Sequence, residues 1–253
     1  MDARFARWYT CSLCEQKYHG DVKCAYGWAC WKTYLGRPEG DWPRLLAMQQ
    51  LGNGLISGKH YEDALSVKEA ELSIRRRLGD SEHNLLITQS NFASTYQYLG
   101  RLEEALSVRQ EVYSGYLKLL GREHQTALTA ATNYASTLRE LQRFDEAKAL
   151  LRRTMPVVRR VLGEGCDTTL RMRWCYAQTL YCDLGSTLND LNEAVSTLEA
   201  AERTARRVLG GAHPITTGIE GDLRDARVAL GAREGGDVAS IREAVAAMTA
   251  GDA

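Results

Sequence analysis

The sequence predicts an all-α protein, a right-handed α-solenoid of antiparallel helix pairs. Three observations predict this fold: a sequence pattern recurs at a fixed period, each period holds two helical segments, and only 4 of the 253 residues are proline. A two-helix unit cannot bury its apolar stripe alone, so neighbouring units are expected to stack into one continuous core.

Leucine–glycine pairs mark the period. The pairs that begin at Leu78, Leu120 and Leu162 are 42 residues apart, and the pair at Leu209 follows after 47. Basic residues precede the pairs, as in "IRRRLG" and "VRRVLG". Because cations near a helix C-terminus complement the macrodipole and glycine favours the left-handed C′ position, each pair is predicted to end a helix.

Residues 1–38 form a Cys- and Trp-rich segment, expected to be mostly a helix that packs on the first repeat. After His19, residues at helical spacing make a stripe that stops before Gly36 and Pro38: Val22, Ala25 or Tyr26, Ala29 and Thr33. A buried helix here would explain Cys24, Cys30 and the tryptophans without a metal.

Residues 39–232 are expected to hold about four repeat units and a terminal helix, and residues 233–253 a capping helix or a tail. The second unit shows one apolar helical stripe, made of Leu86, Phe92, Ala93, Tyr96 and Leu99. The fourth unit carries a five-residue insertion, which we place in the turn "CDLGSTLNDL". Pro156 lies inside a predicted helix and is expected to kink it, because it removes the bond to the Arg152 carbonyl.

A pattern of large, small, large and alanine residues recurs within the units. Its instances are Leu51, Gly52, Leu55 and Ala64; Phe92, Ala93, Tyr96 and Ala105; and Tyr134, Ala135, Leu138 and Ala147. The pattern resembles the tetratricopeptide repeat (TPR). The longer period, the "NFA" and "NYA" openings and the "LGREH" ending look like the TPR repeats of kinesin light chain, over about residues 41–230.

The resemblance implies a non-enzymatic module that binds a peptide or helix of a partner protein in a concave groove. In TPR proteins the first helix of each pair lines that groove. The residues this predicts are Asn91, Ser94, Gln97, Asn133, Ser136, Arg139, Arg171, Trp174 and Gln178. Asparagine and glutamine can bond both the amide and the carbonyl of a peptide backbone, and the arginines could hold acidic groups. Self-association through the repeats is an alternative.

Composition and motifs argue against several other functions. Lys plus Arg and Asp plus Glu are equal at 32 each, so no global field attracts nucleic acid or an anionic membrane. No apolar run has the length of a membrane span or of a signal-peptide core. Seven cysteines suggest no disulfide framework, so a cytoplasmic location is expected. The sequence has no phosphate-binding loop and no hydrolase or metalloprotease motif, so neither enzyme activity nor a cofactor is expected.

A zinc site near the N-terminus is the remaining question. Cys11, Cys14, His19 and Cys24 are candidate ligands, and the C-x2-C spacing of the first two is typical of zinc sites. No metal is favoured, because a buried helix accounts for Cys24. "WYTCSLCEQKY" looks like the end of a RING-CH-type zinc finger. The alternative function is therefore the substrate-recruiting part of a RING-CH-like ubiquitin ligase whose zinc domain is truncated here.

Overall fold

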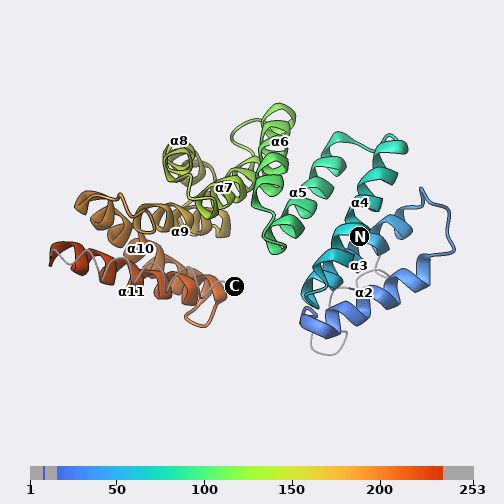
Figure 1. Ribbon diagram of the computed structural model, residues 1–253, viewed down its shortest axis with the longest axis horizontal. Helices are drawn as coiled ribbons and strands as arrows, with labels where there is room; N and C mark the ends of the chain where they lie inside the picture. The colour runs from blue at the N-terminus through green and yellow to red at the C-terminus, as the bar shows by residue number, and fades with distance from the viewer. Residues whose placement is uncertain (1–7, 9–15, 236–253) are drawn as a thin grey trace. The chain divides into compact units, whose positions relative to one another are not determined.

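The computed structural model describes Trp8 and residues 16–235, which contain ten α-helices (Figure 1). The chain divides into two compact units, Met1–Gly115 and Tyr116–Ala253. We call them unit 1 and unit 2 and describe each by itself.

Unit 1 contains α2 (Gly20–Tyr34), α3 (Trp42–Ser57), α4 (Tyr61–Arg77), α5 (Glu82–Tyr98) and most of α6 (Leu102–Leu120). From α2 to α5, each helix packs on the next one along the chain. Gly115 lets α6 approach α5, since a Cβ at this position would lie 2.6 Å from Cδ2 of Leu86.

Unit 2 contains α7 (Gln125–Glu140), α8 (Phe144–Leu162), α9 (Asp167–Tyr181), α10 (Leu188–Leu209) and α11 (Pro214–Glu234). Besides the sequential pairs, α7 packs on α9 and α9 on α11. The first helices of successive repeats therefore form a contiguous layer, which is the arrangement expected of a solenoid of helix pairs.

The predicted helix ends are confirmed. Gly79, Gly121, Gly163 and Gly210 all have positive φ, from 66° to 88°, the left-handed region in which glycine carries no Cβ penalty. At the following helix starts, Nδ1 of His124 accepts the Thr126 amide and Nδ1 of His213 accepts the Ile215 amide, both at 3.2 Å. These histidines are helix N-caps, as their place at inter-repeat loops predicts.

The small residues of the repeat pattern lie where helices touch. The alanines that begin the second helices are all fully buried: Ala64, Ala105, Ala147 and Ala194. Those of the first helices are buried equally: Ala93, Ala135 and Ala177. A methyl side chain permits close helix packing at these points, while the larger residues of the pattern fill the space between helices.

One prediction for the N-terminal helix is wrong. The predicted apolar stripe of α2 is its outer side, since Val22 is 54% exposed and Ala25 and Ala29 are also exposed. The buried side consists of Cys24, Gly27 and Cys30. Glycines let the backbones approach: a Cβ at Gly27 would lie 2.9 Å from the Gln50 carbonyl oxygen, and one at Gly54 would lie 2.8 Å from the Lys23 carbonyl oxygen. Trp28, at 44% exposure, is not explained by burial.

The fourth repeat accommodates its insertion in a longer turn between α9 and α10 and in an earlier start of α10. Residues 182–187 connect the two helices, and Thr187 starts α10 with a capping box to Asp190. In the third repeat, α8 continues through Pro156 to Leu162, so the proline does not end the helix.

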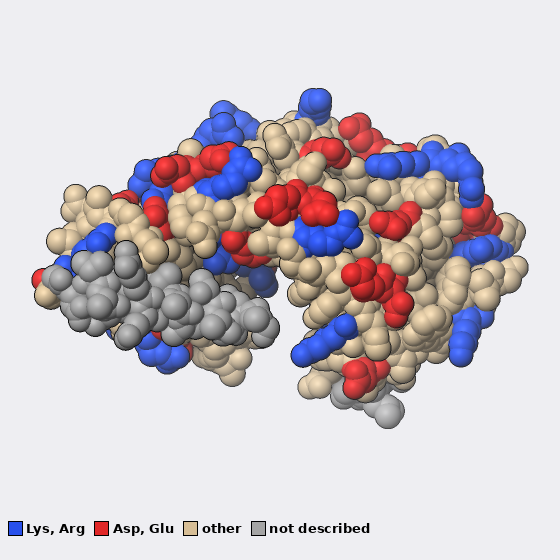
Figure 2. All heavy atoms as spheres, in the orientation of Figure 1, with Lys and Arg blue, Asp and Glu red and all other residues tan. Residues whose placement is uncertain are grey.

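Charged side chains of both signs mix on the surface. Figure 2 shows Lys and Arg interspersed with Asp and Glu over the visible face, in agreement with the equal numbers in the sequence. None of the helices in the described ranges combines the length and apolar character needed to cross a bilayer.

Candidate functional site

The candidate site in unit 2 is the side of α7 and α9 that carries the predicted residues, continued onto α11. We call it the A-helix face, because these are the first helices of their repeats. Asn133, Ser136 and Arg139 recur at three-residue spacing on α7, and Arg171, Trp174 and Gln178 at three- and four-residue spacing on α9. That spacing puts each set on one side of its helix.

Asp222 of α11 organises the α9 part of this face. The Trp174 indole Nε1 and the Gln178 amide Nε2 both donate to Oδ2 of Asp222, the latter at 2.7 Å. Gly218, one turn before Asp222, makes room for the indole, since a Cβ there would overlap the Trp174 ring. The two bonds and the glycine fix the orientation of the large aromatic side chain.

Arg139 of α7 is the basic group of the face. Its side chain is only 16% exposed, its Nε has no hydrogen-bond partner, and its Nη2 lies 3.8 Å from Glu140 Oε1. Burial raises the pKa values of the nearby Cys175 and Cys182 thiols to about 11, so both thiols stay neutral at physiological pH. Glu140 is therefore the carboxylate nearest to Arg139 among the described residues; the guanidinium also hydrogen-bonds to the two thiols, and its unpartnered Nε is buried.

The α11 end of the face is acidic. Burial and the neighbouring charge of Asp222 raise the pKa of Asp225, and burial together with these carboxylates raises the pKa of Tyr181. Neither aspartate forms an ion pair with a described residue; Asp222 is held by the neutral donors named above. The face thus carries a cation on α7 and two carboxylates on α11.

The other predicted residues of unit 2 differ in whether they already bond to side chains within the protein. Arg171 is exposed and pairs with Asp167 at 2.8 Å, and Ser136 donates to Glu140 at 3.3 Å. The half-buried Asn133 makes no side-chain hydrogen bond with a described residue, so its amide is available to a ligand.

The predicted residues of unit 1 lie on α5. Arg109 of α6 donates to the Ser94 hydroxyl at 3.1 Å and to the side-chain Oε1 of Gln97 at 3.2 Å. Both polar groups are thus engaged within the unit by a buried cation. Asn91 is half-buried and, like Asn133, has an amide without a hydrogen-bond partner in the described ranges.

The zinc candidates are not brought together in the described part of the chain. Cys11 and Cys14 lie outside it, and His19 is an exposed helix N-cap. Cys24 packs with Leu51, Leu55 and Ala64, and burial raises the pKa of its thiol. No group of three or more potential metal ligands occurs among the residues described.

Cys175 and Asp222 occupy equivalent places in the repeat. Cys175 follows Asn133 by 42 residues, and Asp222 follows Cys175 by 47, which is also the spacing of the last two leucine–glycine pairs. Cys175 is buried, in keeping with its small apolar side chain. Continuing the repeat phase into α11 would have identified Asp222, which the sequence reasoning missed.

Comparisons with known proteins agree with this architecture. The sequence model of the tetratricopeptide repeat family matches residues 85–126 and 127–165. One similar solved structure consists of kinesin light chain-like, nearly identical TPR-like repeats from Podosopora anserina, with a TM-score of 0.62 and 23% identity, covering 86% of this chain and 98% of that one. Another is BtubC (BKLC) from P. vanneervenii, with a TM-score of 0.65 and 16% identity, covering 90% and 91%. No curated protein matches the sequence.

The fold of the chain is thus that of a TPR α-solenoid. Its particular relatives in fold are kinesin light chain-like TPR proteins, so the resemblance predicted from the sequence is confirmed at the level of the fold. The match to the family supports a protein-interaction module, and TPR proteins are generally scaffolds without enzyme activity.

Proposed function

We propose that this chain is a non-enzymatic protein-interaction module that binds a peptide segment of a partner along the A-helix face. One observation supports this most: the Trp174 ring is held in place by Asp222 and Gly218 on the face that also carries Asn133, whose amide makes no hydrogen bond with a described residue. A positioned aromatic ring next to free donors and acceptors is typical of peptide-recognition surfaces.

Each residue of the A-helix face would make a different kind of contact with the peptide. The Asn133 amide can donate to a peptide carbonyl and accept from a peptide N–H at the same time. Trp174 offers apolar area with little entropy left to lose, since its orientation is already fixed. The exposed part of the Arg139 guanidinium and its loose contact with Glu140, at 3.8 Å, leave it able to bind a carboxylate.

The charge distribution sets a direction for the ligand. An acidic residue of the peptide would lie at Arg139 on α7, and a basic residue at Asp222 and Asp225 on α11. A bound segment would therefore carry charges of opposite sign at its two ends and an apolar residue for Trp174 between them.

The test is a peptide array probed with the full chain, followed by affinity measurement on the best peptides. Replacing Asn133 and Arg139 together by Ala is expected to weaken binding by at least about tenfold, because both the backbone contact and the charge-assisted contact are lost. The control is Arg160→Ala, which removes an exposed arginine of α8 that pairs with Glu123.

Arg139 is largely buried, so its replacement can also affect folding. The half-buried Asn133→Ala alone serves as the second variant, and circular dichroism monitors the helices of both. Unchanged affinity in folded variants would exclude the A-helix face as the binding surface.

A further inference from the structure

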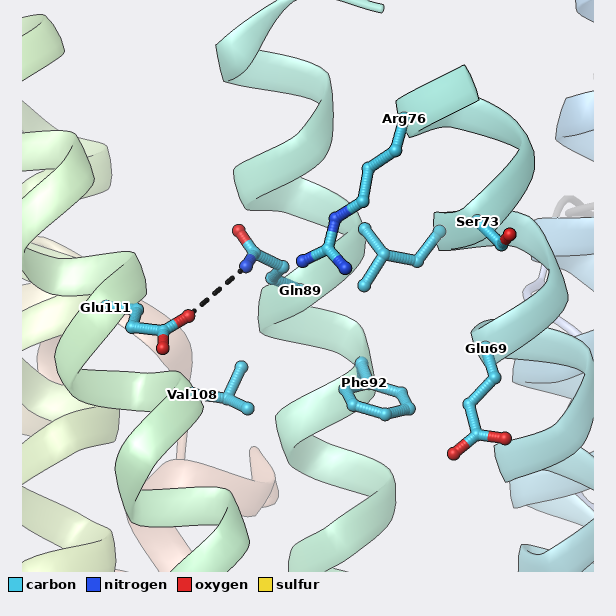
Figure 3. A pocket seen from close by; sticks show the side chains of 8 residues that line it. Glu69, Ser73, Arg76, Gln89, Phe92, Val108 and Glu111 are labelled. Carbon is cyan, nitrogen blue, oxygen red and sulfur yellow. Dashed lines mark hydrogen bonds between the residues drawn. The ribbon is translucent and has the colours of Figure 1, made fainter. Parts of the chain in front are cut away.

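A cavity in unit 1 lies between the second helices of two repeats, α4 and α6, with α5 as its floor. Its volume is about 350 Å³, within the range of about 300–1,000 Å³ that is common for ligand sites. Leu72, Phe92 and Val108 line it with apolar side chains, and Glu69, Arg76 and Glu111 stand around it (Figure 3). We call this cavity the B-helix furrow.

An equivalent cavity exists in unit 2, between α8 and α10 with α9 as its floor. Its volume is about 390 Å³. Arg152, Met155, Arg159 and Tyr176 line it, and each follows its counterpart in the B-helix furrow by 83 or 84 residues, two repeat periods. The furrow is therefore a regular feature of the second-helix layer and not an irregularity of one repeat.

The two cavities differ in whether their charged side chains form ion pairs and hydrogen bonds with one another. In unit 2, Arg152 Nε donates to the Tyr176 hydroxyl at 2.9 Å, and that hydroxyl donates to Glu193 at 2.8 Å. The Arg152 guanidinium also lies 3.8 Å from both Asp190 and Glu193. The polar groups of this cavity satisfy one another.

The charged side chains that line the B-helix furrow form no ion pairs with described residues. Arg75 pairs with Glu71 and Asp80, and Arg77 pairs with Glu39, yet Arg76 between them forms no ion pair with any described residue. Glu69 is exposed and likewise unpaired within the described ranges, and Glu111 only accepts a long hydrogen bond of 3.5 Å from Gln89. An occupant can therefore pair with these groups without breaking an existing ion pair.

The spacing of the open charges fits a helix. Glu69 and Arg76 are seven residues apart on α4, which is about 10.5 Å along its axis. Leu72 lies between them in the sequence and lines the furrow together with Phe92. A helix running antiparallel to α4 would present an acidic residue to Arg76, an apolar residue to Phe92 and a basic residue to Glu69, at positions i, i+4 and i+7.

We propose that the B-helix furrow binds an amphipathic helix of a partner protein, antiparallel to α4, through that triplet of side chains. A third helix is the natural occupant of a channel between two helices, because its side-chain ridges fit the grooves of both neighbours. This site uses the second helices of unit 1, and so the proposal is independent of the one for the A-helix face of unit 2.

The probe is an alanine-based, fluorescently labelled helical peptide with Glu, Leu and Lys at i, i+4 and i+7. Binding to the full chain is measured by fluorescence anisotropy, with an expected Kd on the order of 1 mM for one apolar anchor and two exposed ion pairs. The reversed peptide, with Lys at i and Glu at i+7, is expected to bind at least about fivefold more weakly. Absence of binding at about 10 mM peptide would overturn the proposal.

A charge reversal in the protein tests the site itself. The double variant Glu69→Lys with Arg76→Glu is expected to prefer the reversed peptide, because both ion pairs of the triplet are then inverted. The control is Glu62→Lys, at an exposed position of α4 that does not line the furrow, and it should keep the original preference. A preference that does not reverse in the double variant would refute the assignment.

The position of the bound peptide is tested by methyl NMR spectroscopy. Signals of Leu72 and Val108, which line the furrow, should shift on binding, and those of the exposed Val161 and Val208 should not. Binding that leaves the Leu72 and Val108 signals unchanged would place the peptide elsewhere and contradict the proposal.

Discussion

The second helices of the repeats use one buried position in two different ways. This position holds Lys68 in α4 and Arg109 in α6, but Leu151 in α8 and Leu198 in α10. Lys68 is fully buried and donates to Oδ1 of Asn53 at 3.0 Å. Gly52, where α5, α7 and α9 carry alanine, leaves space for the lysine, since a Cβ there would lie 3.3 Å from Lys68 Nζ.

The stability of the protein should depend on pH through Lys68. Burial lowers the pKa of Lys68 from 10.5 to about 8; Glu71 opposes this shift and Lys23 adds to it. Between these two pH values the unfolded chain holds a proton that the folded chain has released. The free energy of unfolding should therefore rise between pH 8 and pH 10, by on the order of 2 kcal/mol from this group.

The measurement is urea unfolding of the wild type and of Lys68→Met at pH 8 and pH 10. The variant should lack this increment, because methionine does not titrate, while replacement of the exposed Lys118 by Met should retain it. Equal pH slopes in wild type and Lys68→Met would show that Lys68 is not the titrating group.

At the scale of a helix, two glycines of α11 have opposite roles. A Cβ at Gly218 would overlap the Trp174 ring, whereas the nearest atom to a Cβ at Gly221 is the flexible Arg224 Nη2 at 4.0 Å. Glycine inside a helix costs about 1 kcal/mol relative to alanine, which a substitution recovers only where the methyl group fits.

Gly221→Ala should therefore stabilise the protein, by up to about 1 kcal/mol, and Gly218→Ala should destabilise it by about 1–3 kcal/mol because the indole must move. Thermal unfolding of the two variants gives the sign directly. An increase in Tm for both would mean that the Trp174 side chain can move to admit the new methyl group with little loss of stability.

The elements show what the sequence could predict and what it could not. The helix ends at Gly79, Gly121 and Gly163 follow from local chemistry. In each case basic residues are followed by a glycine, the residue that adopts a positive φ without a Cβ penalty, so these ends can be predicted from the sequence. The buried side of α2 is not, because its packing depends on Gly27 meeting Gly54 across two helices, and glycines carry no apolar signal. Helical spacing alone therefore puts Val22 in the predicted stripe, although its side chain is exposed.

The candidate site divides in the same way. Regular spacing predicted which residues share a side of α7 and α9, since that is a property of one helix. The bond from Trp174 to Asp222 joins residues 48 apart and depends on how α11 packs on α9, which periodicity alone does not specify. The engagement of Ser94 and Gln97 by Arg109 likewise requires knowledge of a neighbouring helix.

At the scale of the whole molecule, a solenoid lacks the long-range contacts that tie a globular core together. Each helix described packs mainly on its neighbours in the chain. Stability is then close to a sum of repeat and nearest-neighbour terms, and a local loss should remain local.

Removal of α11 tests this directly. Ile215, Ile219 and Leu223 of α11 are buried against the last repeat, so a chain that ends at Gly211 should exchange amide hydrogens at least about tenfold faster in α9 and α10. A chain that ends at Gly235 keeps α11 and is the control. Equal acceleration in α3 and α4 would show instead that the chain unfolds as one cooperative unit.

The position of Trp174 also has a spectroscopic consequence. The other four tryptophans, Trp8, Trp28, Trp31 and Trp42, belong to unit 1, so Trp174 is the only indole chromophore of unit 2. Its N–H is bound to a carboxylate on a different helix. Replacement of the first four by phenylalanine would leave a chain whose intrinsic emission reports on the A-helix face alone, without any attached dye.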